Sequence, residues 1–315
     1  MTMPTMQSTR FDPLDREVGR LVLGTTWFDP SEQAAAADVL DAFAELGGTI
    51  VDTAENYGRG KSELVIGRWL RDSGHRDRTV VLSKGAHPYD GLSRVDPASI
   101  DDDLKGSLER LGIDTIDIYM LHRDDEGVAV GPILEALNRH QAEGRIRTFG
   151  ASNWSPARLD KAATYAARHG LVGFTSSSVQ FALAEPAEPP WPLCITGRDS
   201  ESRAWYERTR LPLIAWSSQA GGFFAVGDEG PSEAELERVY GTDPNRARRR
   251  RAAELGARLG VSAAQVALAW VAAQSFPVLP IVRTRRPAHL AECAAALELQ
   301  LDPATRAWLD VGSGG

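Results

Sequence analysis

Four side chains with complementary acid–base chemistry stand at or just after the ends of three consecutive strand-like segments. These side chains are Asp52, Tyr57, Lys84 and His122. An ordinary tyrosine has a pKa of about 10 and is a weak acid near neutrality. A neighbouring ammonium group favours the phenolate and lowers that pKa, and a carboxylate keeps the ammonium charged. With an imidazole to hydrogen-bond a carbonyl oxygen, the set predicts a proton donor for a carbonyl group that receives a hydride.

Each of these residues also has a simpler interpretation. A single tyrosine in a loop is more often a packing residue, and Lys84 at a strand end can reach solvent. The run His122–Asp125 can cap a turn, and it lacks a second histidine at ligand spacing, so no metal site is predicted. No G-x-S-x-G motif supports a serine hydrolase. The combination of the four residues, rather than any one of them, favours redox chemistry.

Eight short apolar segments alternate with helix-like segments along the chain. They are residues 21–26, 49–54, 79–84, 115–121, 147–152, 177–181, 211–217 and 278–282. This alternation predicts a single-domain α/β protein, a (β/α)8 TIM barrel over residues 18–311, after a flexible lead-in at 1–17. The first strand is not followed by G-x-G-x-x-G, which argues against an open Rossmann sheet.

Two stretches interrupt the alternation, and both are predicted to be long loops at the C-terminal face of the barrel. Residues 184–202 follow the sixth strand and contain four prolines, and residues 219–251 follow the seventh. Barrels build their active sites on this face. The arginine-rich run 246–251 in the second stretch is interpreted as a solvated helix face.

Composition excludes several classes of protein. The 315 residues include 35 Lys and Arg against 43 Asp and Glu, a formal charge of −8, which argues against a nucleic-acid partner. Two cysteines cannot form a disulfide framework or a four-thiolate zinc site. No apolar run has the length of a transmembrane helix, and the N-terminus lacks a secretory signal, so we expect a cytoplasmic protein without a membrane partner.

Beyond these patterns, the sequence resembles the aldo-keto reductase superfamily from about Val18 to Leu299. The segments that carry the resemblance are VDTAENYGRGKSE (51–63), VVLSKG (80–85), IDIYMLH (116–122), EGRIRTFGASNW (143–154), AAQVALAWV (263–271) and RRPAHLAE (285–292). The resemblance implies a barrel that binds an extended nicotinamide cofactor. It also implies that Tyr57 is the general acid, that Lys84 and Asp52 tune it, and that His122 orients the carbonyl.

The resemblance further assigns residues to the cofactor. These are Thr25, Asp52, Ser152, Asn153, Gln180, Trp216, Ser217, Gly222, Arg283, Thr284, His289 and Glu292. Trp216 stands where the family usually has a tyrosine stacked on the nicotinamide. Arg283 and Thr284 offer a cation and a hydroxyl to a ribose 2′-phosphate, so NADPH is favoured over NADH. His289 and Cys293 depart from the residues usual at their positions.

The function predicted is an NADPH-dependent reductase of an aldehyde, ketone or sugar-like carbonyl, with a small-molecule carbonyl or alcohol as its partner. Candidate walls of the substrate pocket are Trp27, Phe28, Trp154 and Trp191, since aromatic faces suit sugars or flat apolar molecules. The alternatives are a regulatory subunit that binds nicotinamide nucleotide with little turnover, and a barrel hydrolase or isomerase. The sequence specifies neither the substrate, the physiological direction nor the oligomeric state.

Overall fold

The computed structural model describes residues 6–225 and 234–312. Its centre is a closed barrel of eight parallel strands in the order β10-β3-β4-β5-β6-β7-β8-β9. The strands are β3 (Val22–Gly24), β4 (Ile50–Asp52), β5 (Val80–Gly85), β6 (Ile116–Leu121), β7 (Ile146–Ser152), β8 (Ser177–Ser178), β9 (Leu213–Ala215) and β10 (Val278–Val282). The predicted (β/α)8 barrel is confirmed.

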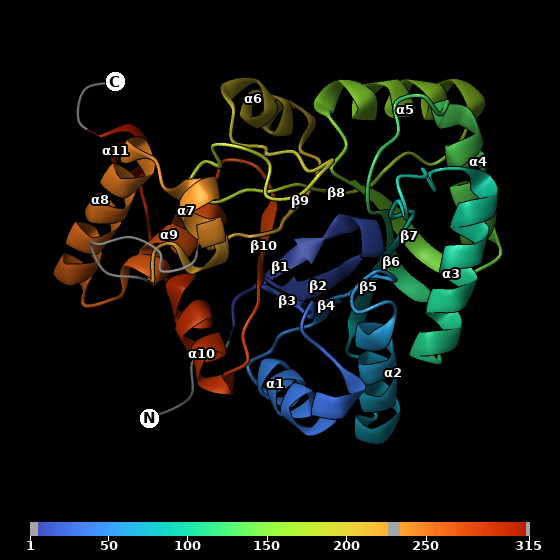
Figure 1. The fold of residues 1–315 in the computed structure, drawn as a ribbon, viewed down its shortest axis with the longest axis horizontal. Coiled ribbons are helices and arrows are strands. Elements are labelled where there is room, and N and C mark those ends of the chain that lie inside the picture. The colour runs from blue at the N-terminus through green and yellow to red at the C-terminus, as the bar shows by residue number, and fades with distance from the viewer. Residues whose placement is uncertain (1–5, 226–233, 313–315) are drawn as a thin grey trace.

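Helices surround the barrel (Figure 1). They are α1 (Gln33–Glu45), α2 (Lys61–Ser73), α3 (Pro97–Leu111), α4 (Val130–Ala142), α5 (Pro156–His169), α6 (Ser200–Thr209), α7 (Ala234–Tyr240), α8 (Asp243–Leu259), α9 (Ala263–Ala272), α10 (Pro287–Ala296) and α11 (Pro303–Val311). Short 3-10 turns lie at η1 (Asp12–Leu14), η2 (Pro30–Glu32) and η3 (Ala220–Gly222). The apolar faces of the helices pack on the outside of the strands and form the larger core.

Helix ends follow the local sequence. At the start of α3, the Asp96 carboxylate accepts hydrogen bonds from the amides of Ala98 and Ser99, and Pro97 supplies the fixed φ of a first helical residue. The helix ends at Gly112, whose φ of 64° suits glycine. At the start of α9, Ser262 and Gln265 form a capping box.

The N-terminal segment differs from the predicted flexible lead-in. Residues 1–5 lie outside the described part of the chain, but β1 (Ser8–Phe11) and β2 (Arg16–Gly19) form an antiparallel hairpin. The buried hairpin residues Phe11 and Val18 pack against Val22, Ile50 and Val80. These three residues are the first residues of β3, β4 and β5. The hairpin therefore closes the barrel at the end opposite to the carboxyl ends of the strands.

The two predicted loops have different outcomes. Residues 184–199 lack helix and strand, as four prolines in this stretch dictate, and α6 then begins at Ser200. The stretch 219–251 is not one long loop, since it contains η3, α7 and the first half of α8, while residues 226–233 lie outside the description. The arginine run is not a solvated face throughout, because Arg248 and Arg249 are buried.

Candidate active site

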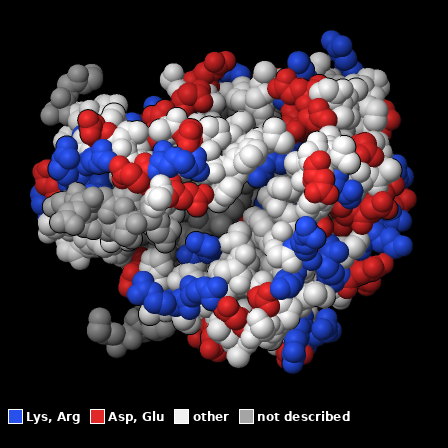
Figure 2. All heavy atoms as spheres, in the orientation of Figure 1, with Lys and Arg blue, Asp and Glu red and all other residues white. Residues whose placement is uncertain are grey.

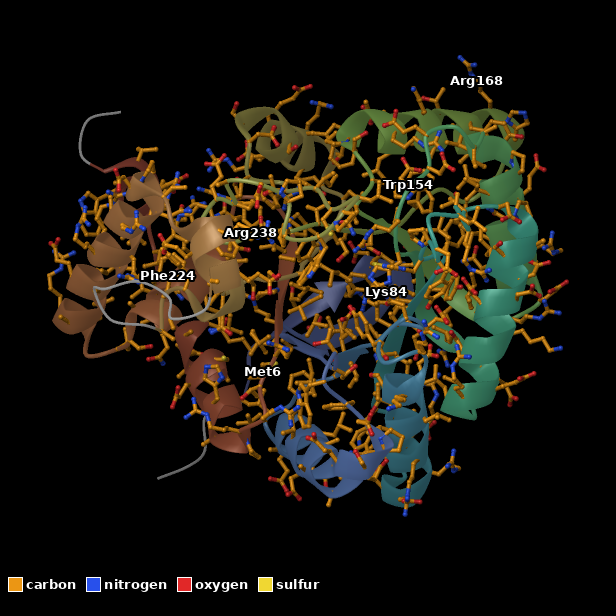
Figure 3. The ribbon with its side chains drawn as sticks, in the orientation of Figure 1. Met6, Lys84, Trp154, Arg168, Phe224 and Arg238 are labelled. Carbon is orange, nitrogen blue, oxygen red and sulfur yellow. The ribbon has the colours of Figure 1, made fainter. Side chains whose placement is uncertain are left out.

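The Lys84 ammonium bonds to two of the other three predicted catalytic groups. Its Nζ donates to Oδ1 of Asp52 at 2.5 Å, to the Thr53 carbonyl at 2.9 Å and to Oη of Tyr57 at 3.1 Å. Asp52 ends β4 and Lys84 lies near the end of β5, so adjacent parallel strands bring the two side chains together. Figure 3 shows Lys84 at β5, in the wall of the barrel.

His122 completes the cluster from the end of β6. Its ring lies edge-on to that of Tyr57, with 5.7 Å between centroids, and its backbone amide donates to the Gly85 carbonyl. The Nδ1 atom is buried and has no hydrogen-bond partner among the described residues. A second imidazole, His87, lies 5.2 Å from His122 between ring centroids. The structure thus brings the four predicted residues together.

Burial sets the protonation states of this cluster. Burial raises the pKa of Asp52 although Lys84 opposes it, while Asp52 and Tyr57 raise the pKa of Lys84 against the effect of burial. The pKa of Tyr57 is raised, because burial and Asp52 outweigh Lys84. The predicted lowering of the Tyr57 pKa is therefore wrong for the protein alone. Burial and nearby cations hold the pKa of His122 well below its usual range, so its imidazole is neutral at pH 7.

The residues expected to hold a nicotinamide carboxamide come from the ends of β7 and β8. Ser152 and Asn153 are buried, and the Asn153 amide is already engaged at both ends. It donates to the His122 carbonyl at 3.1 Å and to Ser152 Oγ at 3.0 Å, and it accepts from the Ile195 amide at 3.3 Å. Gln180 Oε1 accepts from Thr196 at 2.8 Å, whereas its amide nitrogen has only a 3.5 Å contact with Tyr240 Oη. Gln180 therefore keeps more capacity to bind a ligand than Asn153.

The segment after β9 has the features of a cofactor cradle. Trp216 Nε1 is buried without a hydrogen-bond partner among the described residues. Ser217 has a φ of 50°, and Gly222 has a φ of 98° with open space where a Cβ would stand. Glycine tolerates this backbone conformation, and the missing Cβ leaves room for a phosphate beside Gly222. The Gly222 amide itself donates to the Gln219 carbonyl at 3.0 Å. These observations fit the pyrophosphate of a dinucleotide.

At the expected adenine end, Arg283 and Thr284 follow β10. The Arg283 side chain is exposed and has no ion pair or hydrogen bond in the described ranges. Thr284 Oγ1 instead bonds to the backbone of Arg286, accepting from its amide at 2.9 Å. Arg285 is committed to Glu32 and stacks over the Trp27 ring. Arg283 is thus the available cation.

The remaining residues that the resemblance assigns to the cofactor are Thr25, His289 and Glu292. Thr25 is completely buried and bonds to the Asp52 carbonyl at 2.8 Å and to Ser62, so it supports β4 rather than facing a ligand. His289 Nε2 lies 3.8 Å from Cys293 Sγ, which also receives a 3.8 Å contact from Gln219. Glu292 is exposed.

Two of the four proposed pocket walls belong to the core. Trp154 is 0% exposed and packs on Phe174, and Phe28 is 2% exposed, so neither can line an open pocket. Their aromatic character was read as a binding feature, but both pack under the barrel's outer helices. Trp27 donates to the Thr284 carbonyl on the cofactor side. Trp191 is 51% exposed and lies 5.8 Å from Trp216 between ring centroids.

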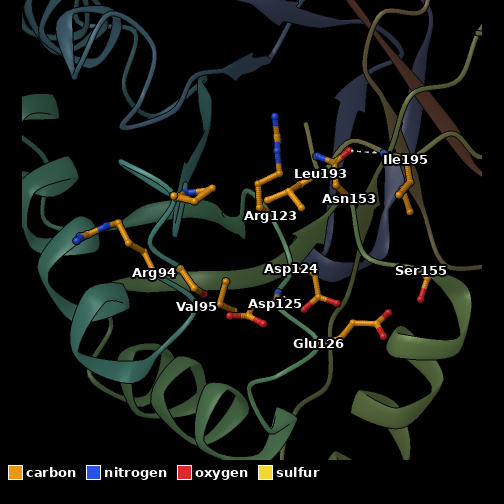
Figure 4. A pocket seen from close by; sticks show the side chains of 13 residues that line it. Arg94, Val95, Arg123, Asp124, Asp125, Glu126, Asn153, Ser155, Leu193 and Ile195 are labelled. Carbon is orange, nitrogen blue, oxygen red and sulfur yellow. Dashed lines mark hydrogen bonds between the residues drawn. The ribbon is translucent and has the colours of Figure 1, made fainter. Parts of the chain in front are cut away.

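A cavity of about 400 Å³ opens beside the cluster (Figure 4). Its lining includes Arg123, the neighbour of His122, and Asn153, the neighbour of Ser152. The space-filling view shows the face turned to the viewer hollowed near its centre, with basic side chains at the rim (Figure 2). Sequence reasoning had missed Arg123, although its position directly after His122 was the available signal.

The described residues contain no group of three His, Cys, Asp or Glu side chains that could hold a metal ion. No single helix in the same ranges is long and apolar enough to cross a membrane, and only α8 and α9 together, which are bent by 101°, have the required length and composition.

The fold and the cluster together define a class of protein. It is a (β/α)8-barrel enzyme in which buried Asp and Lys side chains contact a half-buried Tyr at the carboxyl ends of the strands. A profile of the aldo/keto reductase family matches residues 19–310. The chain belongs to this family and is a carbonyl-reducing oxidoreductase.

Individual relatives agree with this assignment. The chain is 29% identical to an uncharacterized oxidoreductase, YrpG, of Bacillus subtilis, over 94% of this chain and 93% of the relative. It is 27% identical to the NADP(+) aldo-keto reductase yakc of Schizosaccharomyces pombe, over 88% and 82%. The crystal structure of a Klebsiella pneumoniae aldo-keto reductase in complex with NADPH superimposes with a TM-score of 0.74 at 26% identity, covering 98% of this chain and 95% of that one.

Proposed function

We propose that the protein reduces an aldehyde, ketone or sugar-like carbonyl to the alcohol with NADPH, and that Tyr57 is the general acid. The observation that carries the proposal is the 3.1 Å hydrogen bond between Tyr57 Oη and Lys84 Nζ, an ammonium fixed by Asp52. The nicotinamide supplies the hydride that adds to the carbonyl carbon. Tyr57 gives its proton to the carbonyl oxygen.

Each remaining residue supports this proton transfer. Lys84 stabilises the phenolate that Tyr57 becomes, and Asp52 keeps Lys84 charged in its buried position. His122 is neutral and lies beside Tyr57, where an N–H donor can orient the carbonyl oxygen. The raised pKa of Tyr57 keeps the phenol protonated and ready to donate at neutral pH.

The preference for NADPH rests on one cation. Arg283 is exposed and unpaired within the described ranges, so its guanidinium is available to a 2′-phosphate. NADP(H) in the names of the fission yeast relative and the Klebsiella complex supports the same cofactor. Ser217, Gly222 and Trp216 would hold the pyrophosphate and the nicotinamide ring, and Gln180 its carboxamide.

Substitution of Tyr57 tests the proposal. We expect Tyr57→Phe to lower kcat for carbonyl reduction by about 100-fold to 10,000-fold, the usual contribution of a positioned acid. NADPH affinity, followed by tryptophan fluorescence, should change less than about threefold, because the change deletes one hydroxyl. Tyr165→Phe is the matched control, since the Tyr165 hydroxyl donates to Glu135 on the helical exterior.

The outcomes separate the candidate functions. Normal turnover by Tyr57→Phe would remove Tyr57 from the mechanism. Tight NADPH binding by the wild-type protein without turnover across a broad panel of carbonyl compounds would favour the regulatory-subunit alternative.

A further inference from the structure

Arg123 is a buried cation beside the proposed catalytic residues that the mechanism does not use. It is 7% exposed and lines the cavity next to His122. Its Nη1 donates to the His122 carbonyl at 2.9 Å, and its Nε makes a 3.4 Å contact with the Pro192 carbonyl. Its Nη2 has no hydrogen-bond partner in residues 6–225 and 234–312. One guanidinium edge is therefore left for a ligand.

No carboxylate in the described ranges neutralises Arg123, although acidic residues line the same cavity. The other lining arginine, Arg94, forms an ion pair with Asp103. Asp124 is paired with Arg158 at 3.1 Å. Figure 4 shows the Arg123 side chain directed away from Asp124, Asp125 and Glu126. A buried charge without a counter-ion is costly, and such charges are normally paired or used by a ligand.

The Arg123 charge acts on the catalytic groups. It lowers the pKa of His122 and of His87, and it opposes the rise in the pKa of Tyr57. Because Nη1 of Arg123 donates to the carbonyl of His122 itself, the guanidinium lies close to the place where a substrate carbonyl would meet Tyr57 and His122. The cavity is also partly apolar, with Val95, Leu193 and Ile195 in its lining.

We propose that Arg123 binds an anionic group of the substrate, so that the enzyme reduces carbonyl compounds carrying a carboxylate or phosphate on a short apolar body. The inference rests on the proposed reductase function and adds the substrate class. A guanidinium edge with two N–H donors matches the oxygens of either anion. Arg123 is then a specificity-determining residue that contacts the substrate.

Pairs of substrates that differ only in charge test the inference. Carboxylate recognition is read from 4-carboxybenzaldehyde against its neutral methyl ester, and phosphate recognition from glyceraldehyde 3-phosphate against glyceraldehyde. We expect the wild-type protein to prefer the anion in at least one pair. Arg123→Gln should lower kcat/KM for that anion by about 30-fold or more, the effect of truncating one partner of a buried charge pair. The neutral partner should change less than about threefold.

Two further variants distinguish binding from a structural role. Arg123→Lys keeps the charge without the planar donor pair, and it should recover part of the preference. Arg94→Gln removes a cavity cation that is already paired, so the ratio of anion to neutral substrate should stay as in the wild type. Cofactor titration and thermal unfolding of each variant report whether the site and fold are retained.

The outcomes are separable from those of the proposed function. The inference would be overturned if Arg123→Gln lowered kcat/KM equally for the anionic and the neutral substrate of each pair, or if the wild type showed no preference for the anion. Arg123 would then have only a structural role, as a donor to the His122 and Pro192 carbonyls. Failure to reduce any carbonyl compound would instead overturn the reductase proposal itself.

Discussion

His122 shows at the residue scale how burial links the site to pH. Its folded pKa is far below the ordinary value of about 6.5. Below that pH the unfolded chain therefore binds a proton that the folded protein excludes, and stability falls as the pH falls. Between about pH 7.5 and 5.5 we expect the wild type to lose about 1.4 kcal/mol of unfolding free energy relative to His122→Asn. Urea unfolding at both values measures it.

The comparison uses the change with pH rather than the absolute stability, because asparagine in this buried position has its own cost. His169→Asn, at an exposed position on α5, serves as control. A wild-type–variant difference that is the same at both pH values would show that the pKa of His122 in the folded protein equals its value in the unfolded chain.

The proposed preference for NADPH over NADH rests on Arg283. Because its guanidinium is unpaired in the described ranges, Arg283→Ala should weaken NADPH binding by about tenfold and leave NADH binding within about twofold. Titration of tryptophan fluorescence with each cofactor gives both affinities. Arg286→Ala removes a neighbouring exposed cation as control. Equal weakening of NADPH and NADH by Arg283→Ala would place this side chain away from the 2′-phosphate.

Elements with strong periodicity were predictable, and elements defined by distant partners were not. Most barrel strands contain an apolar run, although β8 is Ser177–Ser178, and α3 and α9 carry their caps in the sequence. The hairpin before the barrel is rich in charge, and its strand character depends on Phe11 reaching the barrel interior. Arg248 was interpreted as solvated because its buried partner, Asp310, is 62 residues away.

The residue types of the site were predictable from the sequence, but the burial and the pKa shifts of its side chains were less so. Strand ends placed Asp52 and Lys84 correctly, because carboxyl ends of parallel strands meet at one face. The direction of the Tyr57 pKa shift was missed, since desolvation cannot be judged from spacing. Trp154 was placed in the pocket because the sequence does not reveal which side of a strand end faces the core.

The hairpin β1–β2 makes a testable contribution at the element scale. Phe11 is 3% exposed and lies in the cluster inside the barrel. We expect Phe11→Ala to lower the free energy of unfolding by about 3 kcal/mol, through lost burial and the cavity left behind. Glu17→Gln, at an exposed position of β2, should change it by less than about 0.5 kcal/mol. A loss below about 1 kcal/mol for Phe11→Ala would mean that the barrel is stable without this closure.

Across the whole molecule, Asp310 joins segments that lie far apart in the chain. This residue of α11 is 8% exposed. It pairs with Arg198, after β8, at 2.6 Å, with Arg203 of α6 at 3.2 Å and with Arg248 of α8 at 3.1 Å. The Asp310 carboxylate thus connects α11 to the loop that follows β8 and to α8. The same loop contributes Leu193 and Ile195 to the cavity, so this anchor supports the wall of the site.

Asp310→Asn should therefore destabilise the protein in a pH-dependent way. Burial raises the pKa of Asp310, but the three arginines outweigh burial and hold it below its ordinary value. A depressed folded pKa contributes stability that is complete at pH 7 and is lost as the pH falls through about 4 and below. We expect a loss of about 3 kcal/mol at pH 7, since the buried Arg198 and Arg248 and the half-buried Arg203 each lose a counter-ion, and a smaller difference near pH 3.5. Urea unfolding at the two pH values, with Asp72→Asn on the exposed surface as control, measures both. A difference that does not shrink in acid would mean that Asp310 stabilises through packing or neutral hydrogen bonds rather than through its charge.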